Sequence, residues 1–149
     1  MSLLGEELIS IPLYYTYKDG KYGSKRLVIL GDEQAKKLLE SEEEETKDSV
    51  CILNTKWKSL SWKEQNELVK QSEKPNPTTG MPDLNWPVYQ DVRVKTCLKS
   101  WDFKLNPNDP EPVKVSPDVI DKMNSQVIRA LLDKFDTIVA TDDMEDQDE

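Results

Sequence analysis

SPDVIDKMNSQVIRALLDKFDTIVA, residues 116–140, carries the strongest secondary-structure pattern in the chain. Ser116 is a suitable helix cap, Pro117 fits the first helical position, and Asp118 suits the positive end of a helix. Apolar side chains then recur at steps of three and four residues, at Ile120, Met123, Val127, Leu131, Phe135 and Ile138. This spacing predicts a long amphipathic helix, either continuous or broken into two near residues 124–125.

A second helix is indicated upstream by LSWKEQNELVKQS, residues 60–72. Ser61 and Glu64 have the spacing of a capping box, in which each side chain accepts a hydrogen bond from the other residue's backbone amide. Trp62 lies in the first turn, on the same predicted face as Leu68. We therefore expect the Trp62 indole to anchor the core.

A third helix is predicted in WPVYQDVRVKTCLKSW, residues 86–101, with Pro87 at its start. Val94, Cys97, Leu98 and Trp101 take positions i, i+3, i+4 and i+7, so all four should face the core. Proline-rich segments on either side of this helix predict loops. They cover residues 73–83 and 104–115.

The N-terminal part of the chain has the composition of β-strands. ISIPLYYTY (9–17) and KRLVILG (25–31) are joined by KDGKYGS (18–24), whose glycines suit a hairpin turn. Pro12 cannot donate a hydrogen bond to a neighbouring strand, so it predicts an edge position. A third strand is expected from Val50 to about Trp57, where apolar residues follow one another without clean alternation.

The segment between the hairpin and the third strand is rich in charge. Asp32 is placed to cap a short helix, whose apolar face is limited to Ala35, Leu38 and Leu39. The run Glu42–Glu45 follows, and repulsion between like charges predicts a solvated connection there. The acids are consecutive and lack the central glycine of a calcium loop.

The net charge of −9 is unevenly distributed along the 149 residues. The last eight residues hold six acidic and no basic side chains, so most of the excess negative charge belongs to this end. Such composition predicts a solvated segment rather than a packed one. We expect residues 1–140 to form a single domain and residues 141–149 a disordered acidic tail.

Several function classes fit this composition poorly. The chain has no histidine, two cysteines and no glycine-rich phosphate loop, so common catalytic triads, zinc sites and nucleotide sites are not expected. The negative charge argues against nucleic acid and anionic membranes as partners. No signal peptide or membrane span is evident. The sequence therefore predicts a non-enzymatic, cytoplasmic protein without a metal or cofactor.

The expected fold class is α+β. A small N-terminal β-hairpin and one further strand should pack with three to four helices, followed by the disordered acidic tail. The predicted core comprises Leu13, Val28, Leu30, Ile52, Trp62, Leu68, Leu98, Trp101, Ile120, Val127, Leu131 and Phe135.

The four tryptophans are the main candidates for a functional surface. Large aromatic side chains are usually buried anchors, but exposed ones form hot spots in protein interfaces. Both interpretations stay open at this level. The candidate partner-binding residues are Trp57, Trp86, Trp101 and Phe103.

The order of these elements resembles the small tail assembly chaperones of tailed bacteriophages. The resemblance covers about residues 50–136 and rests on TKWKSLSWKEQNELVKQS, YQDVRVKTCLKSWDF and PDVIDKMNSQVIRALLDKF. In that family a strand leads into a capped helix, a helix ending in Trp follows, and an amphipathic helix closes the chain. The N-terminal hairpin and the acidic tail lie outside the resemblance.

The resemblance implies a holdase that keeps the long helical tape-measure protein soluble before the tail tube polymerises around it. Amphipathic chains aggregate unless their apolar stripes are covered. Two other functions remain open: a structural component of the virion, such as a neck or baseplate protein, and an acidic inhibitor of a host enzyme. A host-encoded adaptor is a further alternative.

Overall fold

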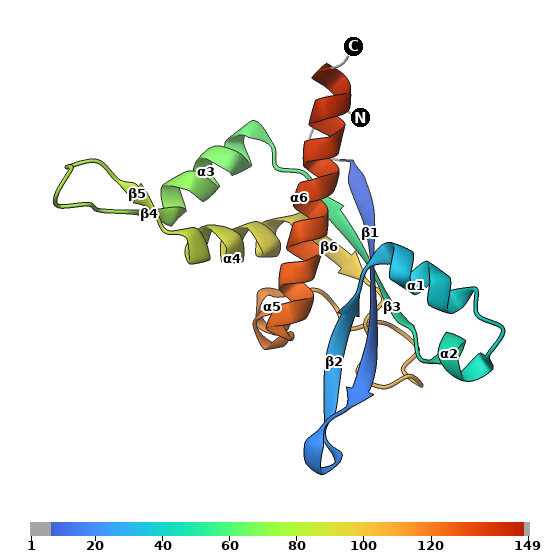
Figure 1. Ribbon diagram of the computed structural model, residues 1–149. Helices are drawn as coiled ribbons and strands as arrows, with labels where there is room; N and C mark the ends of the chain where they lie inside the picture. The colour runs from blue at the N-terminus through green and yellow to red at the C-terminus, as the bar shows by residue number, and fades with distance from the viewer. Residues whose placement is uncertain (1–6, 148–149) are drawn as a thin grey trace.

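A computed structural model describes residues 7–147, with side chains as far as Val139. Its main sheet has four antiparallel strands in the order β2-β1-β3-β6 (Figure 1). These strands are β1 (Leu8–Asp19), β2 (Lys25–Leu30), β3 (Cys51–Lys58) and β6 (Leu98–Trp101). The hairpin between β1 and β2 turns through a short 3-10 segment, Lys21–Gly23.

Six helices accompany the sheet in the described part of the chain. They are α1 (Asp32–Leu39), α2 (Glu44–Asp48), α3 (Trp62–Ser72), α4 (Trp86–Cys97), α5 (Pro117–Lys122) and α6 (Ser125–Gln147). The long helix α6 packs across β1 and β2, while α3 and α4 project sideways from the body (Figure 1). A two-stranded hairpin, β4 (Glu73–Lys74) and β5 (Asp83–Leu84), closes the tip of this projection, which we call the arm. The predicted α+β class is confirmed.

The N-terminal hairpin is confirmed, but β1 is not the edge strand that Pro12 suggested. Pairing with β2 reaches only as far as Tyr14, so Pro12 lies beyond it. Pro12 is opposite Asn54 of β3, whose amide and carbonyl both bond to Asp102 on the other side. The ladder therefore needs no amide from Pro12, and its carbonyl accepts a hydrogen bond from Lys134 of α6.

Strand β3 alternates cleanly between buried and exposed residues, contrary to the expectation of apolar residues without clean alternation. Leu53, Thr55 and Trp57 point into the core, whereas Ile52 is 45% exposed. The prediction of Ile52 as a core residue is therefore wrong. Successive strand residues face opposite sides of a sheet, so an error of one position exchanges buried and exposed residues.

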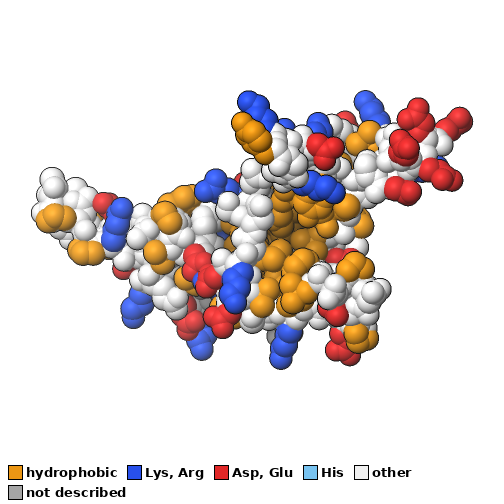
Figure 2. Space-filling model, turned by 90° about the horizontal axis from the view of Figure 1, so that it is seen from below, with side chains coloured by type: hydrophobic (Ala, Val, Ile, Leu, Met, Phe, Trp, Pro, Cys, Tyr) orange, Lys and Arg blue, Asp and Glu red, His pale blue; other side chains and the backbone are white. Residues whose placement is uncertain are grey.

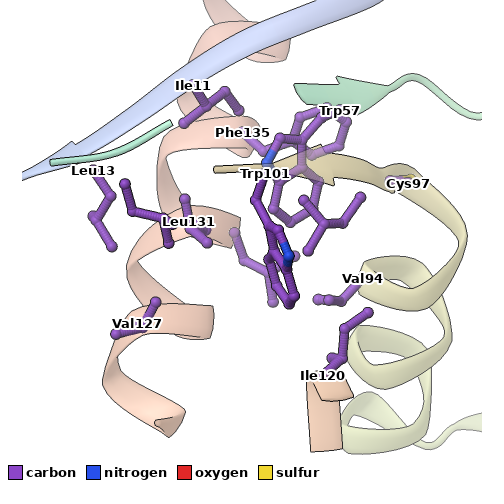
Figure 3. Close-up of a cluster of buried hydrophobic side chains, with 13 residues drawn as sticks. Ile11, Leu13, Trp57, Val94, Cys97, Trp101, Ile120, Val127, Leu131 and Phe135 are labelled. Atoms are coloured by element: carbon purple, nitrogen blue, oxygen red, sulfur yellow. The ribbon is translucent and has the colours of Figure 1, made fainter. Parts of the chain in front are cut away.

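The core lies between the sheet and helices α4, α5 and α6 (Figure 3). Its centre is Trp57, which is 0% exposed and stacks on Phe135 of α6 with ring centroids 5.1 Å apart. The Trp57 indole donates a hydrogen bond of 2.8 Å to the Thr55 hydroxyl, which donates in turn to the carbonyl of Ile11 at 2.7 Å. A polar chain thus crosses the apolar core with each buried group paired.

Most of the predicted core is confirmed. The residues found buried as expected are Leu13, Leu30, Leu68, Leu98, Trp101, Ile120, Val127, Leu131 and Phe135. Val28 is half-buried. Trp62, in contrast, is 82% exposed and does not belong to the core. The buried side of α3 is formed by Leu68 and Ser72, and Trp62 lies about a quarter-turn or more away from that stripe.

The capping box of α3 is present. The Ser61 hydroxyl accepts from the Glu64 amide at 3.2 Å, and the Glu64 carboxylate accepts from the Ser61 amide at 3.1 Å. A hydrogen bond from Lys58, together with that from Ser61, lowers the pKa of Glu64 to about 2. The pKa of Glu64 is lower in the folded protein than its ordinary value of 4.5, so ionised Glu64 stabilises the fold. This stabilisation is complete above about pH 5 and is lost as the pH falls towards 2.

Replacement of Ser61 by Ala should lower the free energy of unfolding by about 1 kcal/mol, because the Glu64 amide loses its acceptor. Urea unfolding followed by circular dichroism measures this change. Ser59→Ala, two residues away and outside the capping box, is the control and should change stability by less than about 0.5 kcal/mol. Equal effects of the two substitutions would contradict the role of the cap.

Helix α4 starts as predicted, with Asn85 as the cap and Pro87 in the first turn, but ends earlier than expected. Residues 98–101 form strand β6 instead of a final helical turn. Leu98 and Trp101 are both buried, so the prediction that they belong to the core was correct. The prediction that they lie in a helix was wrong. The Trp101 indole donates to the carbonyl of Val113 at 2.6 Å and fixes the proline-rich loop that follows.

The C-terminal amphipathic segment is broken near the position left open by the sequence. Met123 has an extended backbone after α5, and α6 begins at Ser125. The Asn124 side chain accepts from the Gln126 amide at 2.8 Å, in the manner of a helix cap. Helical backbone continues through Gln147, into the segment predicted to be a disordered tail; residues 148–149 lie outside the described residues.

The acidic segment before β3 also differs from its prediction. The run Glu42–Glu45 was expected to be a solvated connection, but Glu44 and Glu45 begin the short helix α2. Both lie in its first turn, where negative charge is favourable, and Lys47 lies in its last turn. Helix α1 is capped by Gly31 rather than by Asp32, which is instead its first residue.

Candidate protein-binding groove

Metal ligands and cysteine thiols are the first groups to consider in the part of the chain that the structure describes. No group of three or more Cys, Asp or Glu side chains there is placed to hold a metal ion. Cys97 is buried, and this burial raises the pKa of its thiol to about 11. A thiol with such a pKa is a poor nucleophile at neutral pH. None of the described helices is long and apolar enough to cross a membrane.

A groove of about 270 Å³ runs between α4 and the α5–α6 pair, and we call it the arm groove. Its apolar lining comes from Val94 of α4, Ile120 of α5, and Met123, Ile128 and Leu132 at or beyond the α5–α6 break. Its polar lining comes from Gln90, Asp91, Asp121, Ser125 and Arg129. The groove is therefore an apolar trough with charged edges, the general form of a helix-binding site.

Trp86 and Tyr89 extend the same side of α4 beyond the end of the groove. Trp86, Gln90 and Val94 are four residues apart, so they lie along one face of the helix. The Trp86 and Tyr89 rings stack with centroids 5.2 Å apart and planes within 11°. Trp86 is 57% exposed, although its ring stacks on Tyr89. An exposed tryptophan that stacks on a half-buried tyrosine can provide an anchor for a partner.

Gln90 lies between the aromatic stack and the groove and has an unusual hydrogen-bonding state. Its side-chain oxygen Oε1 is buried and has no hydrogen-bond partner among the described residues. A buried acceptor without a donor costs about 1–3 kcal/mol, so such atoms are uncommon.

Ion pairs hold the walls of the groove together. Lys95 of α4 bridges Asp121 of α5 at 2.7 Å and Asp91 of its own helix at 3.0 Å. The hydrogen bonds that Lys95 donates to Asp121 and, with a smaller effect, to Asp91 raise its pKa, so it stays charged at neutral pH. Arg93 pairs with Asp136 of α6 and also lies over the Phe135 ring. These contacts join α4 to α5 and α6 on both sides of Val94.

The four residues predicted to bind a partner do not form one site. Trp57 and Trp101 are buried in the core and cannot contact a partner in this conformation, so their place in the predicted surface was wrong. Phe103 is half-buried and packs edge-to-face on Trp101, with ring centroids 5.9 Å apart. Trp86 alone of the four is well exposed, on the distant arm.

Comparison of the chain with models of protein families, with curated proteins and with solved structures finds no match. The arm groove must therefore be interpreted from its own residues. Sequence reasoning missed Tyr89 and Gln90, although a signal existed: they lie three and four residues after Trp86, on the same side of a predicted helix.

Other exposed apolar side chains lie elsewhere on the arm. Trp62 and Val69 are seven residues apart and lie on one face of α3, away from buried Leu68. Met81 is exposed at the tip, in a loop whose turn is held by Asn76. Met81 lines a separate pocket within the tip loop. None of Trp62, Val69 and Met81 lines the arm groove, so they provide matched controls for tests of Trp86.

Proposed function

We propose that this chain is a non-enzymatic binding protein that holds an amphipathic helix of a partner protein in the arm groove. The observation that carries the proposal is the stack of the exposed Trp86 ring on the half-buried Tyr89 ring, about one helical turn before the groove residue Gln90. An amphipathic helix presents apolar side chains at positions i, i+3, i+4 and i+7 along one face. Such a face could pack along the apolar lining of the groove and against the Trp86 ring. The charged edges would contact the polar sides of the same helix.

The resemblance to tail assembly chaperones suggests which partner to test first. A tape-measure protein is a long amphipathic helix, and the proposed complex would cover part of its apolar stripe. The strongly acidic composition of this chain would keep such a complex soluble in the cytoplasm of a host cell. The proposal therefore combines a helix-binding site with a role in assembly rather than in catalysis.

The substitutions Trp86→Ala and Tyr89→Ala, made together, should weaken binding of the helical partner at least about tenfold, as loss of an interface anchor does. Trp62→Ala removes an equally large and more exposed indole from α3 and should leave the affinity within about twofold. The partner would be captured with the tagged protein from its native cell and identified by mass spectrometry. Its affinity for each variant would then be measured by calorimetry.

Each outcome of this experiment has a distinct meaning. Capture of a long helical protein by the wild type and by Trp62→Ala, but not by the double variant, supports the proposal. Presence of the chain in finished particles would make it a structural component of the virion. A host enzyme as the sole partner would favour the acidic-inhibitor alternative and would contradict the proposed assembly role.

A further inference from the structure

A second groove lies between the β1–β2 hairpin and the α5–α6 break and shares only Met123 with the arm groove. Its volume is about 400 Å³, within the range of small-molecule sites. Figure 2 shows a hollow in the middle of the face seen from below, with apolar side chains on its floor and walls. We call it the hairpin groove. It contains none of the residues of the Trp86–Tyr89 stack.

The interior of the hairpin groove is apolar and partly aromatic. Tyr15 and Tyr17 of β1 form one wall, with their rings edge-to-face at 5.9 Å, and Phe103 contributes a second aromatic surface. Leu53 and Val127 belong to the buried core, so they give the groove a firm floor. An aliphatic chain bound here would displace water from apolar side chains that the fold already holds in position.

The charge of the groove is opposite to that of the whole chain. Lys25 of β2 and Lys122 of α5 both line it, whereas no Asp or Glu side chain does. Neither lysine has an ion-pair partner within the described part of the chain. Burial also raises the pKa of the Tyr15 phenol, which therefore adds no negative charge. In a chain with 29 acids and 20 bases, this local excess of positive charge indicates an anionic ligand.

We propose that the hairpin groove binds a small anionic amphiphile, a medium-chain carboxylate, with its chain against Leu53 and Val127 and its head group between Lys25 and Lys122. The two lysines, without a carboxylate in the lining, favour a single anionic head group, and the apolar floor favours an aliphatic chain attached to it. Met123 lines the groove at the helix break, and its flexible thioether can adjust to chains of different length. This site is independent of the proposed helix-binding function.

The test uses decanoate as the probe and the full-length protein, with binding measured by calorimetry below the micellar concentration. The double variant Lys25→Gln/Lys122→Gln should bind decanoate about tenfold more weakly, since each exposed ion pair contributes a factor of up to about five. Neutral 1-decanol should bind the wild type and this variant equally. Lys36→Gln, a substitution in α1 outside the groove, is the matched control and should leave decanoate affinity unchanged.

A second variant tests the apolar half of the proposal. Tyr17 is 56% exposed, so Tyr17→Ser should not unfold the protein, but it should weaken binding of both decanoate and decanol. Methyl NMR of Met123 and Val127 would locate the bound chain. Equal affinity of the lysine double variant and the wild type for decanoate, or shifts confined to other methyl groups, would overturn the proposal. Binding of an acidic peptide but not of decanoate would identify the occupant as a protein and overturn it equally.

Discussion

Replacement of Trp57 by Ala should lower the free energy of unfolding by about 3–5 kcal/mol. Trp57 is fully buried at the centre of the core, where its ring stacks on Phe135 and its indole nitrogen bonds to Thr55. The substitution removes the stacking partner and leaves a cavity between β3 and α6 that the surrounding backbone cannot readily close. Urea unfolding followed by circular dichroism measures the loss without depending on tryptophan fluorescence.

Trp62→Ala is the control for this result and should change stability by less than about 0.5 kcal/mol, because the Trp62 ring is mostly in solvent. Trp57→Phe separates the contributions within the core. It retains a ring next to Phe135 but removes the hydrogen bond to the Thr55 hydroxyl. A large loss for Trp62→Ala together with a small loss for Trp57→Ala would contradict the register of β3 and the orientation of α3.

This pair of tryptophans shows which parts of the fold the sequence could predict. The cap at Ser61 and the strand before it were predicted correctly, because both depend on neighbouring residues. Trp57 is buried because its face of β3 meets α6. Trp62 is exposed because a different face of α3 meets α4. The choice of face is made by contacts between segments far apart in the chain, which local spacing does not specify.

The end of α4 provides a second example. Val94, Cys97, Leu98 and Trp101 have helical spacing, yet the last two belong to β6. Thr55 and Lys56 of β3 pair with Trp101 and Ser100, so an available strand edge competes with the final helical turn. Propensity along the chain is a weak preference, and pairing with an existing sheet overrides it. All four side chains are buried in the structure, as their spacing predicted.

The two grooves could not be predicted because they depend on one irregular corner. Met123 lies at the break between α5 and α6 and lines both the arm groove and the hairpin groove. The sequence left this break open as one of two possibilities. The angle that the break sets between α5 and α6 places Asp121 next to Lys95, and Lys122 next to the hairpin. Binding surfaces made by such corners have no signature in local spacing.

Leu131→Ala should lower the free energy of unfolding by about 2–5 kcal/mol. Leu131 is fully buried midway along the stripe of α6, between Val127 and Phe135. Alanine has at least as high a helix propensity as leucine, so the loss reports burial rather than helix formation. Asp133→Ala, an exposed position in the same helix, is the control and should have an effect below about 0.5 kcal/mol. A negligible loss for Leu131→Ala in urea unfolding would mean that α6 does not hold the sheet, and both proposed grooves would lose a wall.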